Sequence, residues 1–356
     1  MPLELIIKIN NKNRMAGTYN NVLELINNTP LVRLNRVTEG MKGSFFAKLE
    51  CYNPGHSTKD RIALHIIENA EKQGLLKPGA TIVETTSGNT GFSIAMVSIV
   101  KGYKCIVAVS DKTKPEKISF LKAMGAKVYL CPANVPANDP RSYYEVAKRL
   151  AANTPNSLYI NQYFNKENTK SHYLSTGPEI WEQTQGKITH LIGCTGTGGT
   201  LTGAAQFLKE KNPDIKVIGV DAVGSVLKKY FETGEVDPNE IKPYQIEGLG
   251  KNLIPGALDF SVIDQYVKVS DEPSAYATRE LALKEGMMVG YTSGASLTAT
   301  RTIADTFDNN SLAVLIFPDH GSRYMTKVFS DEWMASQGFV NSKLNGLESH
   351  ATVEKI

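Results

Sequence analysis

Short apolar runs alternate along this chain with segments in which apolar residues recur at helical spacing, and this alternation restricts the fold more than any other feature. Strand-like runs that alternate with amphipathic helices are typical of βαβ units, whose neighbouring strands run parallel. The expected fold class is therefore α/β, with mainly parallel sheets flanked by helices. The strand-like runs are residues 44–49, 80–85, 105–109, 127–131, 190–194, 216–221 and 312–318, and the expected helices are 59–74, 92–99, 116–124, 141–151, 175–185 and 201–208.

The composition is that of an ordinary globular protein, with 21% charged and 41% hydrophobic residues and a net charge of +3. The length of 356 residues corresponds to about two domains. No dense block of Lys and Arg occurs, which argues against a nucleic-acid partner, and no apolar run approaches the ~18 residues of a membrane span. The apolar patch within residues 1–14 is too short for a signal peptide, and Lys8 lies on its wrong side. We therefore expect a cytoplasmic protein, with Met15 as an alternative start.

The four cysteines show no metal-binding or disulfide pattern. No Cys-x-x-Cys pair occurs, and three of the four lie in apolar, strand-like runs. Buried free thiols in a reducing compartment explain this spacing better than disulfides or a zinc site. The four residues are Cys51, Cys105, Cys131 and Cys194.

The stretch from Asn53 to Arg61 carries the first candidate for chemistry, because it sets a lysine at the start of a helix. Ser57 and Asp60 have the spacing of a capping box, which places Lys59 in the first helical turn. There the positive end of the helix dipole, with partial burial, lowers the pKa of a lysine and favours its neutral amine. A neutral amine can form a Schiff base with a cofactor aldehyde. The alternative is a solvated surface lysine.

A second candidate is the glycine-rich turn at 196–200, between an expected strand and an expected helix. Glycines let the backbone approach an anion, which successive N–H groups, a helix N-terminus and threonine hydroxyls can then bind. The turn is not a Walker loop, since no Gly-Lys-Ser/Thr follows, and Leu201 occupies the third glycine position of a dinucleotide fingerprint. It predicts a phosphate cradle, unless it is only a tight βα turn. Its members are Gly196, Thr197, Gly198, Gly199 and Thr200.

Two further turns are rich in glycine and hydroxyl side chains. The turn at 86–91 could hold a carboxylate through its N–H groups and side chains, and its Asn89 could donate to a phenolate-like oxygen. In the turn at 290–295, the Ser293 hydroxyl could donate to a heteroaromatic nitrogen or serve only as a helix N-cap. Three such turns and an activated lysine suit an amino-acid substrate and a phosphorylated aldehyde, and pyridoxal 5′-phosphate fits all the parts. The non-enzymatic alternative is a metabolite-binding α/β module.

These stretches, in this order, resemble the fold type II pyridoxal-phosphate enzymes, and among them the cysteine synthase and cystathionine β-synthase family. The resemblance covers about residues 19–333 and is carried by 28–31, 53–61, 86–91, 161–163, 196–200, 247–250 and 293–295. It implies a two-domain fold like that of tryptophan synthase β, with the cofactor in the cleft between the domains. Residues 1–52 and 164–335 would form the large cofactor-binding domain, 53–163 a small mobile domain and 336–356 a polar tail. It also implies a homodimer.

The resemblance assigns a role to each matching residue. Lys59 would attach the cofactor and later move the Cα proton, and residues 196–200 would hold the cofactor phosphate. Asn89 would bond the 3-hydroxyl of the cofactor, and Ser293 would face its pyridine nitrogen. The residues implied to hold the α-carboxylate of the substrate are Thr86, Ser87, Thr90 and Gln162.

The implied reaction is a β-replacement on serine or an O-activated serine through an aminoacrylate, with a thiol as the entering group. The segment 318–333 resembles the cystathionine β-synthase branch, which joins serine and homocysteine, and only its catalytic core is expected here. The alternative is a cysteine synthase that uses O-acetylserine or O-phosphoserine with sulfide; the 86–91 loop argues against a dehydratase. His56 and Thr58 depart from the usual small residue and Val, and Lys251 stands where that branch often has Tyr.

Overall fold

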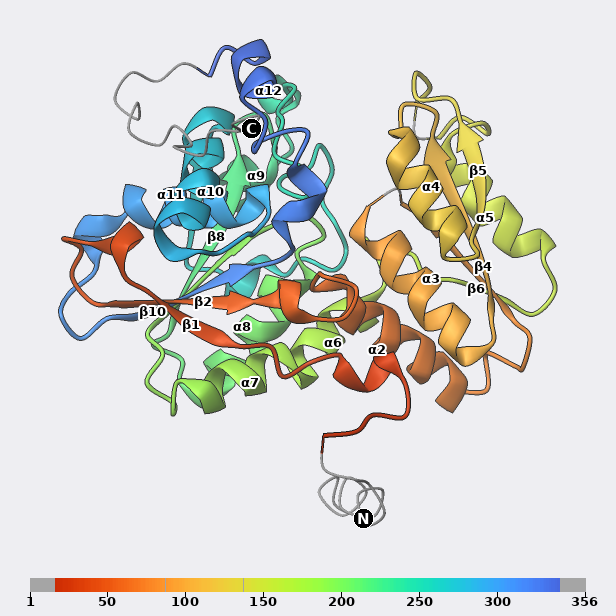
Figure 1. The fold of residues 1–356 in the computed structure, drawn as a ribbon, viewed down its shortest axis with the longest axis horizontal. Helices are drawn as coiled ribbons and strands as arrows, with labels where there is room; N and C mark the ends of the chain where they lie inside the picture. Colours follow the sequence, from red (N-terminus) through yellow and green to blue (C-terminus); the bar gives the residue numbers. More distant parts are fainter. Residues whose placement is uncertain (1–16, 87, 137, 340–356) are drawn as a thin grey trace, which may run out of the picture.

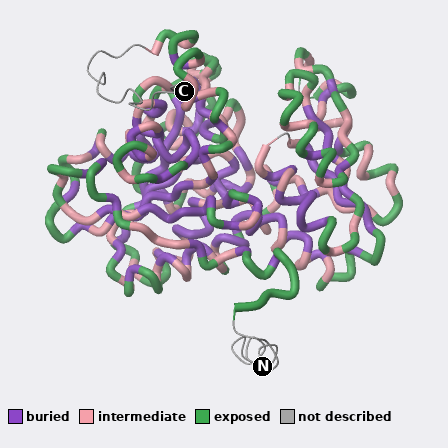
Figure 2. The backbone as a smooth tube through the Cα atoms, in the orientation of Figure 1, coloured by how far each residue is buried: buried purple, intermediate pink, exposed green. Residues whose placement is uncertain are grey.

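The computed structural model describes residues 17–86, 88–136 and 138–339, which form two lobes, each built around its own sheet (Figure 1). Figure 2 shows the buried backbone concentrated in the interior of each lobe, with exposed loops around it. The strands are buried because helices cover both faces of each sheet, as expected for parallel strands joined by helical crossovers. The predicted class of parallel α/β sheets is confirmed.

The smaller lobe contains a four-stranded sheet in the order β5-β4-β3-β6, with every pair parallel. Helix α3 covers one face through Ile94 and Val97, and α5 covers the other through Ala147. The elements of this lobe are β3 (Thr81–Thr85), α3 (Asn89–Lys101), β4 (Lys104–Ser110), α4 (Pro115–Ala123), β5 (Lys127–Cys131), α5 (Tyr143–Asn153) and β6 (Ser157–Tyr159).

The larger lobe contains a six-stranded sheet in the order β1-β2-β10-β7-β8-β9. Only the edge pair β1–β2 is antiparallel. Helices α10 and α11 pack on one face around Tyr291 and Leu297, and α7 and α8 pack on the other around Ile180 and Leu208. The strands are β1 (Leu31–Leu34), β2 (Ser44–Leu49), β7 (His190–Cys194), β8 (Lys216–Ala222), β9 (Gln265–Val269) and β10 (Leu312–Phe317).

The remaining elements connect and cover this sheet. The helices are α6 (Lys166–Leu174), α7 (Thr176–Gln183), α8 (Gly199–Lys211), α9 (Leu227–Thr233), α10 (Asp271–Glu285), α11 (Tyr291–Thr302) and α12 (Asp331–Ser336). The 3-10 turns are η1 (Val22–Leu25), η2 (Arg36–Thr38), η3 (Glu50–Tyr52), η4 (Pro238–Glu240), η5 (Phe260–Val262), η6 (Ala304–Thr306) and η7 (Gly321–Tyr324).

Helix α2 (Lys59–Lys72) lies where the lobes meet and packs against α3 of the small lobe and α6 of the large lobe. Its apolar residues recur at helical spacing, so one face buries Ile62, Ile66 and Ala70 in the core of the small lobe. The helix is therefore fixed from both sides. Because it begins at Lys59, this packing fixes the backbone of the candidate lysine.

Every strand in the expected set appears within two residues of its expected bounds. The sequence did not predict β6, β9, α6, α9, α10 and α12, and for α11 it predicted only the turn at its start. All strands of the smaller sheet fall within 53–163 and all strands of the larger sheet fall outside it; the domain boundaries themselves stay a prediction. The expectations for Met15, for residues 1–14 and for most of the tail at 336–356 lie outside the described residues. No described helix is long and apolar enough to cross a membrane.

Candidate active site

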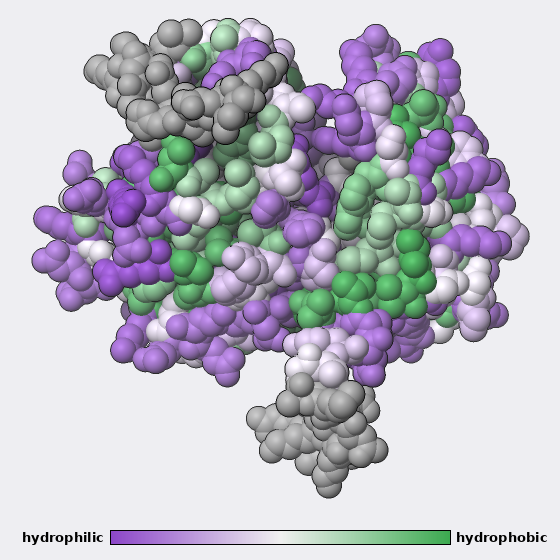
Figure 3. Space-filling model, in the orientation of Figure 1, coloured by the Kyte–Doolittle hydropathy of each residue, from purple (hydrophilic) through white to green (hydrophobic). Residues whose placement is uncertain are grey.

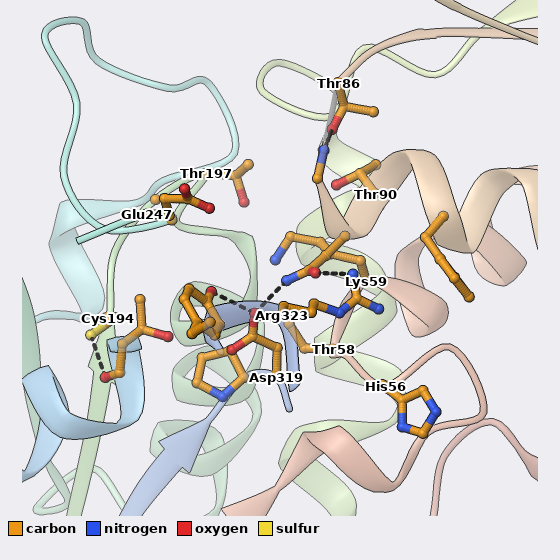
Figure 4. A pocket seen from close by; sticks show the side chains of 18 of the residues that line it. His56, Thr58, Lys59, Thr86, Thr90, Cys194, Thr197, Glu247, Asp319 and Arg323 are labelled. Carbon is orange, nitrogen blue, oxygen red and sulfur yellow. Dashed lines mark hydrogen bonds between the residues drawn. The ribbon is translucent and has the colours of Figure 1, made fainter. Parts of the chain in front are cut away.

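A cavity of about 670 Å³ opens between the two lobes. Thr86 follows β3, Cys194 ends β7 and Asp319 follows β10, and all three line the cavity. They lie at the carboxyl ends of parallel strands, where ligand sites of open α/β sheets usually form. Figure 4 shows Thr86 on one side and Thr197 on the other. The predicted site residues that line the cavity are Lys59, Thr86, Asn89, Thr90, Gln162, Gly196, Thr197, Gly198 and Thr200.

Lys59 begins α2 and lines the cavity, as its position in the sequence predicts. Burial lowers the pKa of its amine, the nearby charge of Lys251 lowers it further, and Asp319 and Glu50 oppose the shift. The predicted direction is therefore confirmed, with burial as the largest cause. A lysine with a lowered pKa has a larger fraction of neutral amine, the form that attacks carbonyl groups and accepts protons.

The predicted capping box before α2 is wrong. Ser57 Oγ accepts from the N–H of Lys59 at 3.3 Å, two residues on instead of three. The Asp60 carboxylate accepts instead from Gly55 N at 2.5 Å and from Ser93 Oγ at 2.5 Å on α3. Asp60 therefore joins the loop before Lys59 to the small lobe. The spacing alone could not show this, because α3 is distant in the sequence.

A buried ion network anchors the first turn of α2 from the other side. The Arg61 guanidinium donates to both oxygens of Glu50, at 2.6 and 2.8 Å, and to both oxygens of Glu179, at 2.6 and 2.8 Å. Lys48 Nζ donates to Glu179 at 2.7 Å and to the Thr29 carbonyl at 2.7 Å. Two cations thus meet two carboxylates. The sequence reading missed the network because its members come from four separate elements.

The turn at 196–200 joins β7 to α8, and its glycines are required by the packing. A Cβ on Gly196 would meet the Gly248 carbonyl, and one on Gly198 would meet Leu258. Gly198 also has a φ of +82°, a left-handed conformation that favours glycine. Gly196, Gly198 and Thr200 line the cavity, so the backbone where α8 begins borders it. Backbone N–H groups at the start of a helix form a donor set that fits a phosphate group.

Two buried side chains hold the threonines of this turn. Asn168 Nδ2 donates to Thr197 Oγ1 at 3.1 Å, and Thr200 Oγ1 lies 3.1 Å from His172 Nε2. His172 is fully buried, and burial lowers its pKa well below the usual range, so its ring is neutral at pH 7. The other ring nitrogen lies 2.8 Å from Thr176 Oγ1. The sequence reading missed both supports, since they lie on the unpredicted helix α6.

The loop after β3 and the segment after β6 meet at the cavity. Thr90 Oγ1 donates to Gln162 Oε1 at 2.7 Å, so the amide N–H₂ of Gln162 stays available to an acceptor in the cavity. Thr86 Oγ1 accepts from Gly88 N at 3.2 Å. Thr86, Thr90 and Gln162 thus line the same cavity, and their role as carboxylate ligands stays a prediction. Ser87 lies outside the described residues.

Asn89 starts α3 and lines the cavity beside Asp319. Its Nδ2 donates to Asp319 Oδ2 at 2.8 Å, and its Oδ1 accepts from the guanidinium of Arg323. Asp319 Oδ2 also accepts from the Tyr324 hydroxyl at 2.8 Å. Burial raises the pKa of Asp319, although Asn89, Tyr324, Arg323 and Lys59 all favour its charged form. The sequence analysis assigned no role to Asp319, which lines the same cavity as Lys59 and whose negative charge raises the pKa of Lys59.

In the turn at 290–295, Thr292 lines the cavity. Ser293 is fully buried, and its Oγ has no hydrogen-bond partner among the described residues. Both residues lie in the first turn of α11. The predicted role of Ser293 toward the cofactor nitrogen stays a prediction.

The residues that depart from the family pattern also lie at the cavity. His56 has a φ of +59° and lines the mouth, with its ring centroid 5.5 Å from that of His320. Thr58 Oγ1 is buried and has no partner among the described residues. All four cysteines are free, as expected, and no cluster of described residues could hold a metal ion.

Comparison with known proteins also indicates pyridoxal-phosphate chemistry. The family model described as pyridoxal-phosphate dependent enzyme matches residues 22–319. The chain is 43% identical to the cystathionine β-synthase of Apis mellifera over 90% of this chain and 63% of that protein. It is 37% identical to cysteine synthase 1 of Emericella nidulans over 94% of this chain and 91% of that protein. The chain thus spans about three fifths of the length of the cystathionine β-synthases it matches.

Two solved structures share the fold. A hydrogen sulfide-producing enzyme from Fusobacterium nucleatum superposes with a TM-score of 0.79 at 35% identity, over 87% of this chain and 99% of that one. An O-ureido-L-serine synthase also superposes with a TM-score of 0.79, at 34% identity over 89% of this chain and 99% of that one. The fold is thus shared with two enzymes that are named for different products.

Proposed function

The chain belongs to the family of pyridoxal-phosphate dependent enzymes, and from this premise we propose that it replaces the β-substituent of serine, or of an O-activated serine, with a thiol. It is an enzyme of the cystathionine β-synthase and cysteine synthase type. We favour serine and homocysteine as its substrates, with cystathionine as the product. The observation that carries the proposal is the half-buried Lys59, which has a lowered pKa and lies at the wall of the cavity between the lobes.

The chain's own residues supply distinct parts of this reaction. The N–H groups and threonines at 196–200 would hold the cofactor phosphate, and Asn89 and Thr292 line the cavity where its ring would lie. When bound, pyridoxal phosphate supplies an electron sink for negative charge at Cα. Lys59 Nζ would take the proton from Cα and later return it, which its lowered pKa favours.

The α-carboxylate of the substrate would bind at the loop after β3. Thr86, Ser87, Thr90 and Gln162 are its proposed ligands. The bond from Thr90 to Gln162 orients the amide so that its N–H₂ can donate to the carboxylate. Fixing the carboxylate in this way would also fix the Cα–H bond relative to Lys59, and such orientation is a large part of catalysis.

A cysteine synthase, with O-acetylserine or O-phosphoserine and sulfide as substrates, is the second candidate. The match to the fungal cysteine synthase favours it, because that match covers most of both chains. The matches to cystathionine β-synthases have the higher identity but cover only part of those proteins.

The proposal is tested by a Lys59→Ala variant of the purified, cofactor-loaded protein, with Lys72→Ala on the same helix as the matched control. Lys72 is exposed at the far end of α2. Loss of both the nucleophile and the base should reduce kcat by roughly 10³-fold or more, and the visible cofactor absorbance should change. Lys72→Ala should match the parent. A fully active Lys59→Ala protein would refute the proposal.

The same assay separates the two candidate reactions. Turnover of serine with homocysteine would support the cystathionine branch. Turnover only of O-acetylserine or O-phosphoserine with sulfide would support cysteine synthesis. If the protein showed no cofactor absorbance after incubation with pyridoxal phosphate, both candidates would fail.

We also propose that the small lobe, residues 53–163, moves over the substrate during the reaction. Contacts across the mouth of the cavity support this. Lys117 on α4 pairs with Glu247 of the large lobe at 2.9 Å, and Lys327 pairs with the same carboxylate. Lys114 Nζ donates to Thr326 Oγ1 at 3.3 Å. These partly exposed contacts are weak enough to break and re-form during catalysis.

A homodimer and a cytoplasmic location are further parts of the proposal. Exposed apolar residues support the dimer, since Figure 3 shows hydrophobic side chains gathered over α3, and such patches often mark protein–protein surfaces. Light scattering should give twice the chain mass. The exposed apolar residues on η1 and α3 are Val22, Leu25, Ile99 and Val100.

The cytoplasmic location is supported by the four free cysteines, which suit a reducing compartment.

A further inference from the structure

Lys251 is a cavity-lining cation that the proposed reaction does not use. It follows the 247–250 loop, and its backbone is fixed on both sides by Ser225, whose Oγ accepts from Lys251 N at 2.9 Å and donates to Lys251 O at 3.0 Å. Its amine lies 4.7 Å from the centroid of the Tyr163 ring and 3.3 Å from the Tyr163 hydroxyl. The side chain is thus held at the cavity by a fixed backbone and an aromatic neighbour.

Lys251 differs from Lys117, Lys327 and Arg323, three other cations of the cavity, in what it contacts. Lys117 and Lys327 share the Glu247 carboxylate. Arg323 donates to Asn89 and Gly55, and its charge acts on Asp60 and Asp319. No carboxylate of residues 17–86, 88–136 and 138–339 forms an ion pair with Lys251.

The position of Lys251 relative to Lys59 makes this lack of a partner consequential. Its charge is close enough to contribute to the lowered pKa of Lys59, so both amines act in the same cavity. The Lys251 amine borders the cavity and can donate to a group that enters it. A ligand that brought an anionic group to this wall would receive a charge-assisted hydrogen bond.

We propose that Lys251 binds an oxyanionic group of a substrate, distinct from the α-carboxylate of the amino-acid donor. The α-carboxylate has its own ligands in the loop after β3 and in Gln162, none of which is cationic. The oxyanion that Lys251 binds is therefore either a phosphate leaving group on the donor or the carboxylate of the thiol acceptor. This inference rests on the proposed β-replacement, and it makes Lys251 the residue that sets which charged substrate is used.

The test compares Lys251→Met, Lys251→Arg and Lys242→Met in the cofactor-loaded enzyme. Methionine keeps the length of the lysine stem without its charge. Lys242 is exposed on the same segment and lies outside the cavity, so its variant controls for a general loss of positive charge. Arginine restores the charge.

Each arm of the experiment changes one oxyanion. The donor arm compares KM for O-phosphoserine with KM for O-acetylserine, using sulfide as acceptor. The acceptor arm compares KM for homocysteine with KM for its decarboxylated analogue 3-mercaptopropylamine. Loss of one charge-assisted hydrogen bond should raise KM for the oxyanionic member of one arm by about tenfold or more in Lys251→Met. In Lys251→Met, KM for the counterpart that lacks this oxyanion should stay within about threefold of the parent. In Lys251→Arg and Lys242→Met, KM for both members of each arm should stay within about threefold of the parent, because arginine keeps the positive charge and Lys242 lies outside the cavity.

The outcome decides between the sources and can overturn the proposal. A selective change in the donor arm assigns phosphate to Lys251, and a selective change in the acceptor arm assigns the carboxylate. If Lys251→Met changed KM equally for the substrates with and without the oxyanion, or left KM unchanged in both arms, the proposal would be refuted. If the parent turned over no substrate pair, the proposed function would fail. Calorimetric titration of O-phosphoserine and homocysteine into the parent and Lys251→Met would still test the oxyanion site, because only an oxyanion ligand loses affinity in the variant.

Discussion

Glu50 and Glu84 are both fully buried glutamates, and their carboxyl groups behave in opposite ways. Burial alone would raise the pKa of Glu50, but the charges of Arg61 and Lys48 lower it to about 2. Burial raises the pKa of Glu84 to about 7, although the N–H groups of Thr85 and Gln162, at 2.6 and 3.1 Å, favour its charged form. One carboxylate is permanently charged, and the other holds a proton near neutral pH.

The difference follows from where the two residues lie. Glu50 belongs to the ion network that anchors α2, in which cations and carboxylates balance. Glu84 lies near the end of β3, just before the loop proposed to bind the substrate carboxylate, and no cation among the described residues forms an ion pair with it. Asp60 is intermediate: it has two hydrogen bonds, and burial raises its pKa to about 6. Full ionic pairing thus supports the scaffold, while incompletely compensated carboxyl groups lie beside the cavity.

Removal of Arg61 should give the largest loss of stability, because Arg61 supplies the positive charge that pairs with Glu50 and Glu179. An Arg61→Met variant would leave Glu50 and Glu179 buried with Lys48 as their only cation. Breaking such a buried pair typically costs about 3 to 5 kcal/mol of unfolding free energy. Urea unfolding at pH 7 measures it. Arg141→Met is the matched control, since Arg141 pairs with Asp139 at the surface, and its unfolding midpoint should not change. Equal midpoints for both variants would mean that the network does not stabilise the fold.

Removal of the charge at the two glutamates should affect the pH dependence of the unfolding free energy in different ways. In the folded state Glu84 keeps its proton up to about pH 7, whereas the unfolded chain releases it near its ordinary value of 4.5. Stability therefore falls as pH rises from 4.5 to 7, and Glu84→Gln should remove this slope. Relative to the parent, the variant should gain roughly 3 kcal/mol between pH 4.5 and pH 8.

Glu50→Gln should differ from the parent by a constant loss over the same range. The pKa of Glu50 is about 2 in the folded state, so its stabilising charge is present throughout and is lost only as pH falls below 4.5. Urea unfolding at several pH values compares both variants with the parent. Parallel pH profiles for Glu84→Gln and Glu50→Gln would show that the two carboxyl groups do not differ.

Much of the fold could be predicted because its signals are local. Residues 44–49, 127–131 and 190–194 are strands with the predicted bounds, since short apolar runs between turn residues have few other conformations. Helix α10 was missed because its sequence, with Glu, Arg and Lys between small residues, shows no clear apolar stripe. Strand β9 was missed because lysine and tyrosine interrupt its apolar pattern. Tertiary packing determined both elements.

The site was predictable only where one loop carries the chemistry. The turn at 196–200 and the position of Lys59 could be read from contiguous residues. The cavity-lining position of Thr292, next to Ser293, could not, because it depends on how α11 is turned toward the cavity. Asp319, His172 and Asn168 were missed because each reaches the site from an element distant in the sequence. The capping box failed for the same reason, since the partner of Asp60 lies on another helix.

The smallest of these effects tests the intermediate case, Asp60. Ser93→Ala removes the hydroxyl that donates to Asp60 at 2.5 Å, and it also removes a bond within α3 to the Asn89 carbonyl at 3.0 Å. Loss of a buried hydrogen bond to a carboxylate should cost about 1 to 2 kcal/mol. The pKa of Asp60 should also rise further above 6, because the bond from Ser93 favours its charged form.

The matched control for Ser93→Ala is Ser274→Ala. Ser274 is equally buried and donates to a carbonyl one turn earlier, Ser270 O at 2.8 Å, but no carboxylate accepts from it. The difference between the two variants in urea unfolding therefore isolates the bond to Asp60. It should grow from pH 5 to pH 8, because the lost bond matters most when Asp60 is charged. A difference that stayed constant with pH would place Asp60 with the permanently charged Glu50 instead of between Glu50 and Glu84.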